Sequence, residues 1–299
     1  MRCMMGIHAH PDDECFQAGS WVRYRREGVK TVLVTCTLGE EGEIRDPALD
    51  PQEARPRLGQ IREGELRCSA EKLGLSELIL MRYRDSGMAG TPANTRPDAF
   101  TNTDFEAALE RVVELVRRHR PQVLFSYDEN GGYGHPDHIM AHRLAVAAFD
   151  AAADKARFPH VGEPWQPLKL YYIALSRSYF MRVREYLKQQ GLPDPFEQRE
   201  REAREKALAE GKSPDETPRQ GFGRSDEDIT TQVPVPGTYD EKIASLLCHK
   251  TQMPPDGIWF ALPREEAEQF FGVEHYILAK SRVESQLPED DLFAGIQGM

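Results

Sequence analysis

The chain of 299 residues is long enough for one large domain or two modest ones, and its 39% apolar content is that of an ordinary globular protein. Its 38 basic and 49 acidic residues give a net charge of −11, which disfavours binding to nucleic-acid phosphates. The longest clean apolar run, residues 144–149, is far shorter than the roughly 20 residues that span a bilayer. We therefore expect a globular protein without nucleic-acid or membrane partners.

The cysteines indicate a reducing environment. All five are widely scattered and none belongs to a CxxC pair: Cys3, Cys15, Cys36, Cys68 and Cys248. An odd number without paired spacing is typical of reduced thiols in a cytosolic protein. The sequence thus predicts five free thiols, mostly small core residues, and a cytoplasmic location.

Apolar runs alternate with amphipathic stretches through the first half of the chain, which is the pattern of βαβ units and a mainly parallel sheet. Strands are expected at residues 4–9, 30–37, 77–83 and 122–127, and helices at 17–27, 57–73 and from 136 onward. A T-x-x-E capping box formed by Thr103 and Glu106 predicts the start of another helix, which ends at the basic residues before Pro121.

The second half of the chain has weaker patterning. Residues 154–167 are rich in proline and predict a connecting loop, followed by a strand at 169–175 and a helix at 179–190. Eight of the ten residues 197–206 are charged, which predicts an exposed helix or a mobile insertion. Residues 214–228 are expected to be a surface loop, with a helix near 240–249 and a strand near 275–279 after it.

These elements predict an α/β fold: a Rossmann-like, mainly parallel sheet with helices on both faces and a smaller C-terminal elaboration. Residues 1–175 would form the α/β core, which would carry the reaction chemistry. Residues 176–299 would form the elaboration, which carries the charged insertion and elements on the substrate side.

Two clusters of ionisable residues directly follow predicted strands. The first reads HAHPDDE at residues 8–14 and the second reads YDENGGYGHPDH at residues 127–138. Ligands bind beyond the carboxyl ends of strands in open parallel sheets, so we expect the two clusters to meet. Imidazole and carboxylate ligands suit Zn²⁺ or a similar divalent ion, and three such ligands leave a position open for water. The spacing leaves open which of Asp12, Asp13 and Glu14 binds the metal and which acts as a base.

The same motifs resemble the zinc-dependent deacetylase superfamily named for PIG-L and LmbE, through HPDDE near the start of the chain and GYGHPDH in its middle. Three further segments, VTCTLGEEGEI, RDSGMAGT and DLFAGI, resemble its mycothiol branch, which contains an N-acetylglucosaminyl-inositol deacetylase and a mycothiol S-conjugate amidase. RDSGMAGT favours the deacetylase, whereas KLYYIALSRSYFMRVREYL and DLFAGI favour the amidase.

The resemblance implies a role for each residue of the two clusters. His10, Asp13 and His138 would hold zinc, with Fe²⁺ as an alternative ion in the cell, and Asp12 would be the general base. Tyr133 would polarise the amide carbonyl and stabilise the oxyanion.

The resemblance also implies residues around the substrate. His135 would supply positive charge or a proton near the departing amine, with Asp137 orienting it, and Arg62 and Asp85 match positions that contact the sugar–inositol substrate. Gln17 stands where the deacetylase would have Ser and the amidase Lys, so it is a further expected substrate contact that leaves the preference open.

The leading hypothesis is therefore a zinc-dependent N-deacetylase acting on a small amino-sugar conjugate, with a glucosaminyl–cysteine amidase as the alternative. A metallo-phosphoesterase is more distant, because such sites usually hold two metals. A non-catalytic binding protein using residues 197–228 as a docking arm is a third class.

Two further histidines are not expected to bind the metal. His142 is expected to face the helix interior or lie behind the metal ligands, and His249 is expected to be structural or on the surface. The sequence makes no prediction of oligomeric state.

Overall fold

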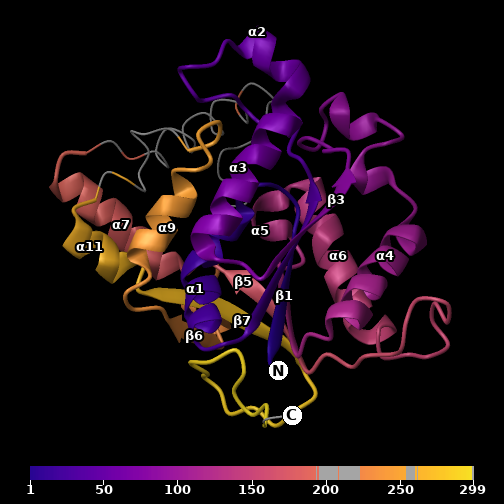
Figure 1. Ribbon diagram of the computed structural model, residues 1–299. Helices are drawn as coiled ribbons and strands as arrows, with labels where there is room; N and C mark the ends of the chain where they lie inside the picture. Colours follow the sequence, from indigo (N-terminus) through magenta and orange to yellow (C-terminus); the bar gives the residue numbers. More distant parts are fainter. Residues whose placement is uncertain (193, 195–207, 209–222, 254–259, 261, 298–299) are drawn as a thin grey trace.

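The computed structural model describes residues 1–192, 194, 208, 223–253, 260 and 262–297. In this part of the chain, seven strands form a single sheet in the order β3-β2-β1-β4-β5-β7-β6 (Figure 1). The strands are β1 Cys3–His8, β2 Lys30–Thr37, β3 Glu77–Tyr83, β4 Val123–Ser126, β5 Lys169–Ala174, β6 Thr231–Pro234 and β7 Val273–Ser281. The first five are parallel, and β7 runs antiparallel to both of its neighbours. The predicted α/β class is confirmed.

Helices cover both faces of this sheet (Figure 1). One face carries α4 Phe105–His119 and α6 Pro136–Ala151, and the other carries α1 Ala18–Arg26, α3 Leu58–Leu73 and α9 Tyr239–Leu246. The remaining described helices are α2 Pro51–Ala54, α5 Gly131–Gly134, α7 Arg177–Gln189 and α11 Arg264–Phe270.

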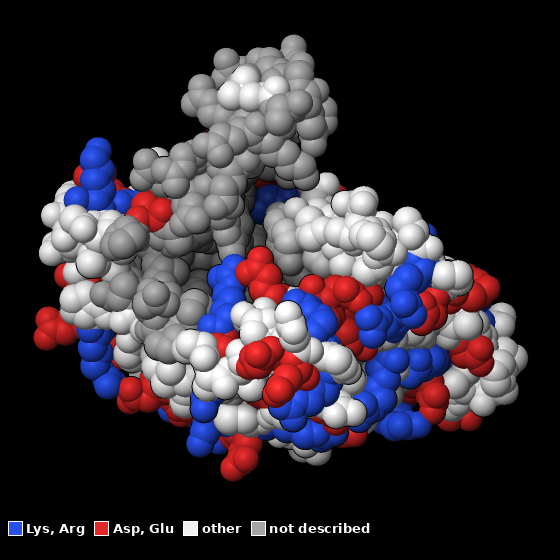
Figure 2. Space-filling view, turned by 90° about the horizontal axis from the view of Figure 1, so that it is seen from above, with Lys and Arg blue, Asp and Glu red and all other residues white. Residues whose placement is uncertain are grey.

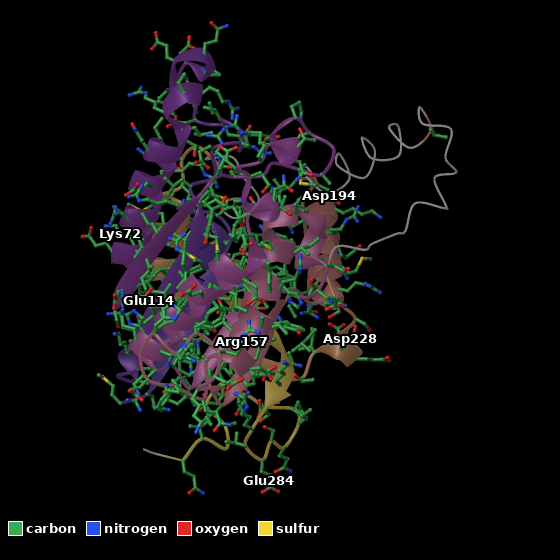
Figure 3. All side chains as sticks on the ribbon, turned by 90° about the vertical axis from the view of Figure 1, so that its right-hand side faces the viewer. Lys72, Glu114, Arg157, Asp194, Asp228 and Glu284 are labelled. Atoms are coloured by element: carbon green, nitrogen blue, oxygen red, sulfur yellow. A yellow bond between two sulfur atoms is a disulfide. The ribbon has the colours of Figure 1, made fainter. Side chains whose placement is uncertain are left out.

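Alternation along the central strands divides the core into two layers. Met5 and Ile7 of β1 join the layer under α4 and α6, whereas Met4 joins the opposite layer with Trp21 of α1. Residue 6 in β1 is a glycine because a Cβ there would come within 2.9 Å of the rings of Trp21 and Phe125. Charged residues such as Lys72, Asp228 and Glu284 project from the periphery (Figure 3), and acidic and basic side chains intermingle on the face seen in Figure 2.

Most predicted elements agree with the structure to within a few residues, but the start of α4 differs. Its N-cap is Asp104, whose Oδ1 accepts the Ala107 N–H at 2.8 Å, whereas the Thr103 hydroxyl donates to the Phe100 carbonyl. Either residue type can cap a helix, and the local turn decides between them. The capping-box prediction was therefore wrong by one residue.

Four short elements among the described strands and α-helices had no counterpart in the prediction, namely the strand β6 and the helices α2, α5 and α11. None of them is long enough to display a clear period. The predicted helix or insertion at 197–206 lies outside the described residues, as does most of the predicted loop at 214–228. No helix among the described residues is both long and apolar enough to cross a membrane.

The prediction of five reduced thiols was wrong for two cysteines. Cys68 of α3 forms a disulfide with Cys248, which follows α9, while Cys3, Cys15 and Cys36 are free and buried. The partners are 180 residues apart in sequence, so only the packing of α3 against α9 brings them together. Spacing rules cannot detect such a pair.

A buried ion pair attaches the end of the chain to the sheet. Lys169 of β5 contacts Glu289, and both side chains are almost fully buried. The Tyr171 hydroxyl donates to the same carboxylate at 2.7 Å, and the Glu289 backbone bonds to Thr230 and Gln232 beside β6. Residue 289 thus closes the antiparallel edge of the sheet.

We expect Glu289→Gln to lower the free energy of unfolding by about 3–5 kcal/mol, because Lys169 would remain buried and charged without its partner. Urea unfolding measures the loss. The double variant Lys169→Met/Glu289→Leu should lose less than the single variant, since it removes both charges. An equal or larger loss in the double variant would contradict this account, and Asp98→Asn at the exposed Arg96 pair should leave stability unchanged.

Candidate metal-binding active site

The loops that follow β1 and β4 meet because these two strands are parallel neighbours in the sheet. His10 and Asp13 come from the first loop, and His138 comes from the first turn of α6, which follows the second. The three side chains are buried, and their ligand atoms lie within 4.8 Å of one another. This is the convergence that the sequence predicts.

The spacing of these three side chains suits one metal ion. His10 Nδ1 lies 3.1 Å from His138 Nε2 and 3.8 Å from Asp13 Oδ2, and His138 Nε2 lies 3.5 Å from Asp13 Oδ1. Two ligand atoms on one tetrahedral zinc at about 2.0–2.1 Å would be about 3.3 Å apart. The donor set of two imidazoles and one carboxylate is also that of hydrolytic zinc sites.

Each of the three candidate ligands is oriented by a hydrogen bond on its far side. His10 Nε2 lies 3.1 Å from Asp137 Oδ2, and His138 Nδ1 lies 3.1 Å from the Gly131 carbonyl. Asp13 Oδ2 accepts the Tyr127 hydroxyl at 2.5 Å. These contacts leave Nδ1 of His10 and Nε2 of His138 facing each other, which is the outer support typical of metal ligands.

The electrostatics of the pocket favour a cation. Burial alone would lower the pKa of His10, but its hydrogen bond to Asp137 and the charges of Asp85 and Asp13 raise it to about 9. Burial lowers the pKa of His138 to about 4, so this imidazole is neutral. The pKa of Asp13 lies below its ordinary value despite burial, because His138 and His10 face it. The carboxylate-rich pocket thus attracts positive charge and holds Asp13 ionised.

Asp12 lies beside this triad in a strained backbone conformation. Its φ of 103° is in the left-handed region, which costs a non-glycine residue on the order of 1–3 kcal/mol. Its Oδ1 lies 3.3 Å from Arg62 Nη2, and its N–H donates to Glu14 Oε2 at 3.0 Å. Burial raises the pKa of Asp12 to about 6, with Arg62 acting in the opposite direction. A carboxyl group in this range is suited to proton transfer near neutral pH.

Tyr133 and His135 lie on the glycine-rich loop before α6. The Tyr133 side chain is 50% exposed, and its ring centroid lies 5.0 Å from that of His138, so it reaches solvent directly above a candidate ligand. His135 Nδ1 accepts the Asp137 N–H at 3.2 Å and so caps α6. Burial and the neighbouring His10 and His138 lower the pKa of His135 to about 3. The neutral ring then carries its proton on Nε2.

Asp137 is placed differently from its expected role of orienting His135. Its carboxylate contacts His10 Nε2 and accepts both the Ser86 hydroxyl and the Ser86 N–H. Only its backbone N–H contacts the His135 ring. Asp137, Asp85, His10 and His135 together form a second group whose ligand atoms lie within 4.8 Å of one another. The hydrogen bonds of this group support the ligand His10.

The three expected substrate residues lie in different environments. Arg62 is buried and donates to the carbonyls of Gly39 and Pro11 at 2.8 and 2.5 Å, in addition to its contact with Asp12. Asp85 accepts the N–H groups of Gly87 and Glu41, and its Oδ1 lies 3.8 Å from His10 Nε2. Arg62 and Asp85 are therefore next to the triad.

Gln17 is buried at the end of the 3-10 turn Asp13–Gln17, where it lines a cavity of about 40 Å³ with residues of α7, α11 and β7. Its Oε1 has no hydrogen-bond partner among the described residues. The described contacts do not join Gln17 to the three candidate ligands.

Several residues of the site were not assigned a role from the sequence. Tyr127 and Ser86 lie within or beside the motifs and could have been suspected from their position, whereas Arg224 could not. Arg224 Nε donates to Asp128 Oδ2 at 2.8 Å, and Asp128 Oδ1 accepts the Gly132 N–H at 2.8 Å, which shapes the segment that carries Tyr133.

The expected placement of His142 is confirmed. It is buried, and its Nδ1 lies 2.9 Å from the Tyr127 carbonyl oxygen, behind the candidate ligands.

Comparison with known proteins identifies the family. Residues 5–149 match the family model described as PIG-L, GlcNAc-PI de-N-acetylase. The chain is 42% identical over 99% of both chains to a 1D-myo-inositol 2-acetamido-2-deoxy-alpha-D-glucopyranoside deacetylase of Geodermatophilus obscurus. It is 37% identical to a mycothiol S-conjugate amidase of Streptomyces coelicolor, over 98% of this chain and 97% of the relative.

A solved structure has the same fold. It is the N,N'-diacetylchitobiose deacetylase of Pyrococcus horikoshii, with a TM-score of 0.58 at 16% identity, covering 93% of this chain and 83% of that one. The two relatives align with this chain over almost its whole length, and residues 8–14 and 127–138, which carry the candidate metal-binding residues, lie within the region that matches the family model. The chain belongs to the PIG-L family of deacetylases.

Proposed function

We propose that this protein is a metal-dependent N-deacetylase that hydrolyses the acetamide of an N-acetylglucosamine conjugate such as N-acetylglucosaminyl-inositol. The observation that carries the proposal is the buried triad of His10, Asp13 and His138, with Asp12 directly preceding Asp13 in the same loop. A relative of 42% identity named for deacetylating an amino-sugar conjugate of inositol supports the substrate class. The protein is thus a hydrolase acting on a linear amide.

His10, Asp13 and His138 would hold the metal, for which we propose zinc, with Fe²⁺ as the alternative. Such an ion, when bound, polarises a carbonyl oxygen and lowers the pKa of a coordinated water toward 7. The chain contributes the orientation of the ligands, because Asp137, Gly131 and Tyr127 fix them from outside.

Asp12, Tyr133 and His135 would act on the substrate. Asp12 takes the proton of the attacking water and later returns it to the departing amine, as a general base and acid. The exposed Tyr133 hydroxyl donates to the carbonyl oxygen as negative charge develops there, a contact worth about 3–4 kcal/mol in comparable sites. The Nε2–H of His135 supplies a second donor next to the amine.

Arg62 and Asp85 would face the sugar–inositol part of the substrate, and Gln17 would influence the choice of acyl group. The buried contacts of Arg62 with the Pro11 carbonyl and Asp12 give it a second role, which is to hold the first loop in place.

A cytoplasmic location of the protein stays a prediction. Three free cysteines agree with it, whereas the Cys68–Cys248 pair is uncommon in reducing compartments.

Cleavage of a glucosaminyl–cysteine amide is the second candidate, because a relative named as a mycothiol S-conjugate amidase is 37% identical over nearly the whole chain. An amine-release assay on N-acetylglucosaminyl-inositol and on the cysteine adduct, with zinc and Fe²⁺ each supplied, compares the two. We expect kcat/KM for the acetamide to be higher by about tenfold or more. The reverse order would favour the amidase, and release from neither substrate would refute both.

We expect Asp12→Asn to lower kcat by about 100- to 10,000-fold, because the amide cannot accept the proton of the attacking water. Metal analysis of the same sample should show one ion per chain, as in the wild type. A variant that retains its metal and has more than about a tenth of wild-type activity would contradict the assignment of Asp12 as the base.

We expect Tyr127→Phe to weaken metal binding by about 10- to 100-fold, because Asp13 loses the hydroxyl that orients it. Competition with a chromogenic chelator measures the affinity. Tyr83→Phe is the matched control, since the Tyr83 ring stacks on Phe100 away from the ligands. Equal affinities of the Tyr127 variant and the wild type would show that this hydrogen bond is dispensable.

A further inference from the structure

Glu14 lies at the centre of a buried cluster directly behind the candidate base. Its Oε2 accepts the N–H of Asp12 at 3.0 Å. Its Oε1 accepts the Ser69 hydroxyl at 2.5 Å and lies 2.6 Å from His249 Nε2. The side chains of Glu14 and His249 have no exposed surface. One carboxylate therefore joins the backbone of Asp12 to groups on two other elements.

The disulfide joins the residues that immediately precede these two groups. Cys68 precedes Ser69 on α3, and Cys248 precedes His249 after α9. A single covalent link thus joins the neighbours of Ser69 and His249, which are two of the hydrogen-bond partners of Oε1, the third being Cys15 Sγ at 3.5 Å. The mechanism proposed above uses neither the disulfide nor Glu14.

The cluster functions through hydrogen bonds. Glu14, Cys15 and His249 have the residue types of a metal site, and their ligand atoms lie within 4.8 Å of one another. However, the 2.6 Å between Glu14 Oε1 and His249 Nε2 is a direct hydrogen bond, whereas two ligands of one tetrahedral zinc would be about 3.3 Å apart. Glu14 also holds the Asp12 N–H with its second oxygen.

The strained backbone of Asp12 is the reason why this support matters. A residue with a φ of 103° keeps that conformation only where its surroundings impose it. The bond from the Asp12 N–H to Glu14 is one such restraint, and the contact of its carboxylate with Arg62 is another. Loss of the first restraint would let the peptide turn and move the carboxylate away from the attacking water.

We propose that Glu14 is a positioning residue for Asp12, and that the Cys68–Cys248 disulfide keeps its two partners, Ser69 and His249, in place. Reduction of the disulfide then lowers the rate of the chemical step while the metal stays bound. The metal ligands are oriented by other groups, namely Tyr127, Gly131 and Asp137, which lie between the end of β4 and the start of α6. Their orientation therefore does not depend on the disulfide or on Glu14. The inference rests on the proposed function.

The test begins with the thiols. The denatured, unreduced protein should have three titratable thiols, and five would overturn the role of the disulfide. A trialkylphosphine then reduces the native protein: each disulfide gives two thiols as the phosphine takes the oxygen of one water and becomes its oxide. Metal content is measured before and after reduction and should not change.

Amide exchange and steady-state kinetics are then measured on the wild type before and after reduction. The Cys68→Ser/Cys248→Ser variant is the control, because it has no such disulfide for the phosphine to reduce. Amide exchange in the peptide that contains Asp12 should rise by about tenfold or more. The value of kcat should fall by about 10- to 100-fold, with KM changed by less than about twofold, because a misplaced base affects chemistry more than binding.

The variant His249→Leu should show the same loss of kcat without any reductant. The variant His249→Gln should regain part of the lost kcat, because its amide can donate to Glu14. Reduction of the disulfide should lower kcat little further in either variant.

Unchanged amide exchange after reduction overturns the proposal whatever the activity. Faster exchange with unchanged kcat overturns the positioning role. Faster exchange in a protein that releases amine from no substrate would refute the proposed function while the link between the disulfide and Asp12 stands.

Discussion

The burial of carboxylates around His10 is the constraint on which the site depends. Asp13, Asp85 and Asp137 are all nearly inaccessible to solvent, and each would be costly to ionise without compensation. Backbone N–H groups, Ser86 and Tyr127 supply part of that compensation, and the raised pKa of His10 shows that positive charge is still favoured. A divalent cation would compensate the buried carboxylates better than a proton on His10. Its charge is larger, and the three candidate ligands His10, Asp13 and His138 can share it.

The sheet order explains where this arrangement forms. The chain builds outward from β1 to β2 and β3, then crosses back to place β4 on the other side of β1. The loops after β1 and β4 therefore lead to helices on opposite faces of the sheet, which is the kind of position where ligands bind in other open α/β sheets. His10 and Asp13 come from the first of these loops, and His138 comes from the start of α6 after the second.

The parts that sequence reasoning predicted are those with strong local signals. The buried strands before both motifs and the convergence of the two motifs follow from hydrophobic runs and strand topology, whereas the choice of His10, Asp13 and His138 within them came from the family resemblance. What it could not predict depends on contacts distant in sequence, such as the disulfide across 180 residues and the Arg224–Asp128 pair. The actual partner of the Asp137 carboxylate was also missed, because the resemblance implied His135, and the sequence gives no information about which ring this carboxylate reaches.

The supports of the site are divided between different parts of the fold, and this division bears on specificity. Tyr127, which directly follows β4, and Asp137 of α6 orient the candidate metal ligands. Arg62 of α3 and the contacts of Glu14 with α3 and the turn after α9 hold the loop of Asp12. The loop of Tyr133 is held separately, by Asp128 and Arg224. Residues that contact the substrate can therefore change while the amide-cleaving centre is retained. The relatives of 42% and 37% identity differ in the same way, since one is named as a deacetylase and the other as a mycothiol S-conjugate amidase.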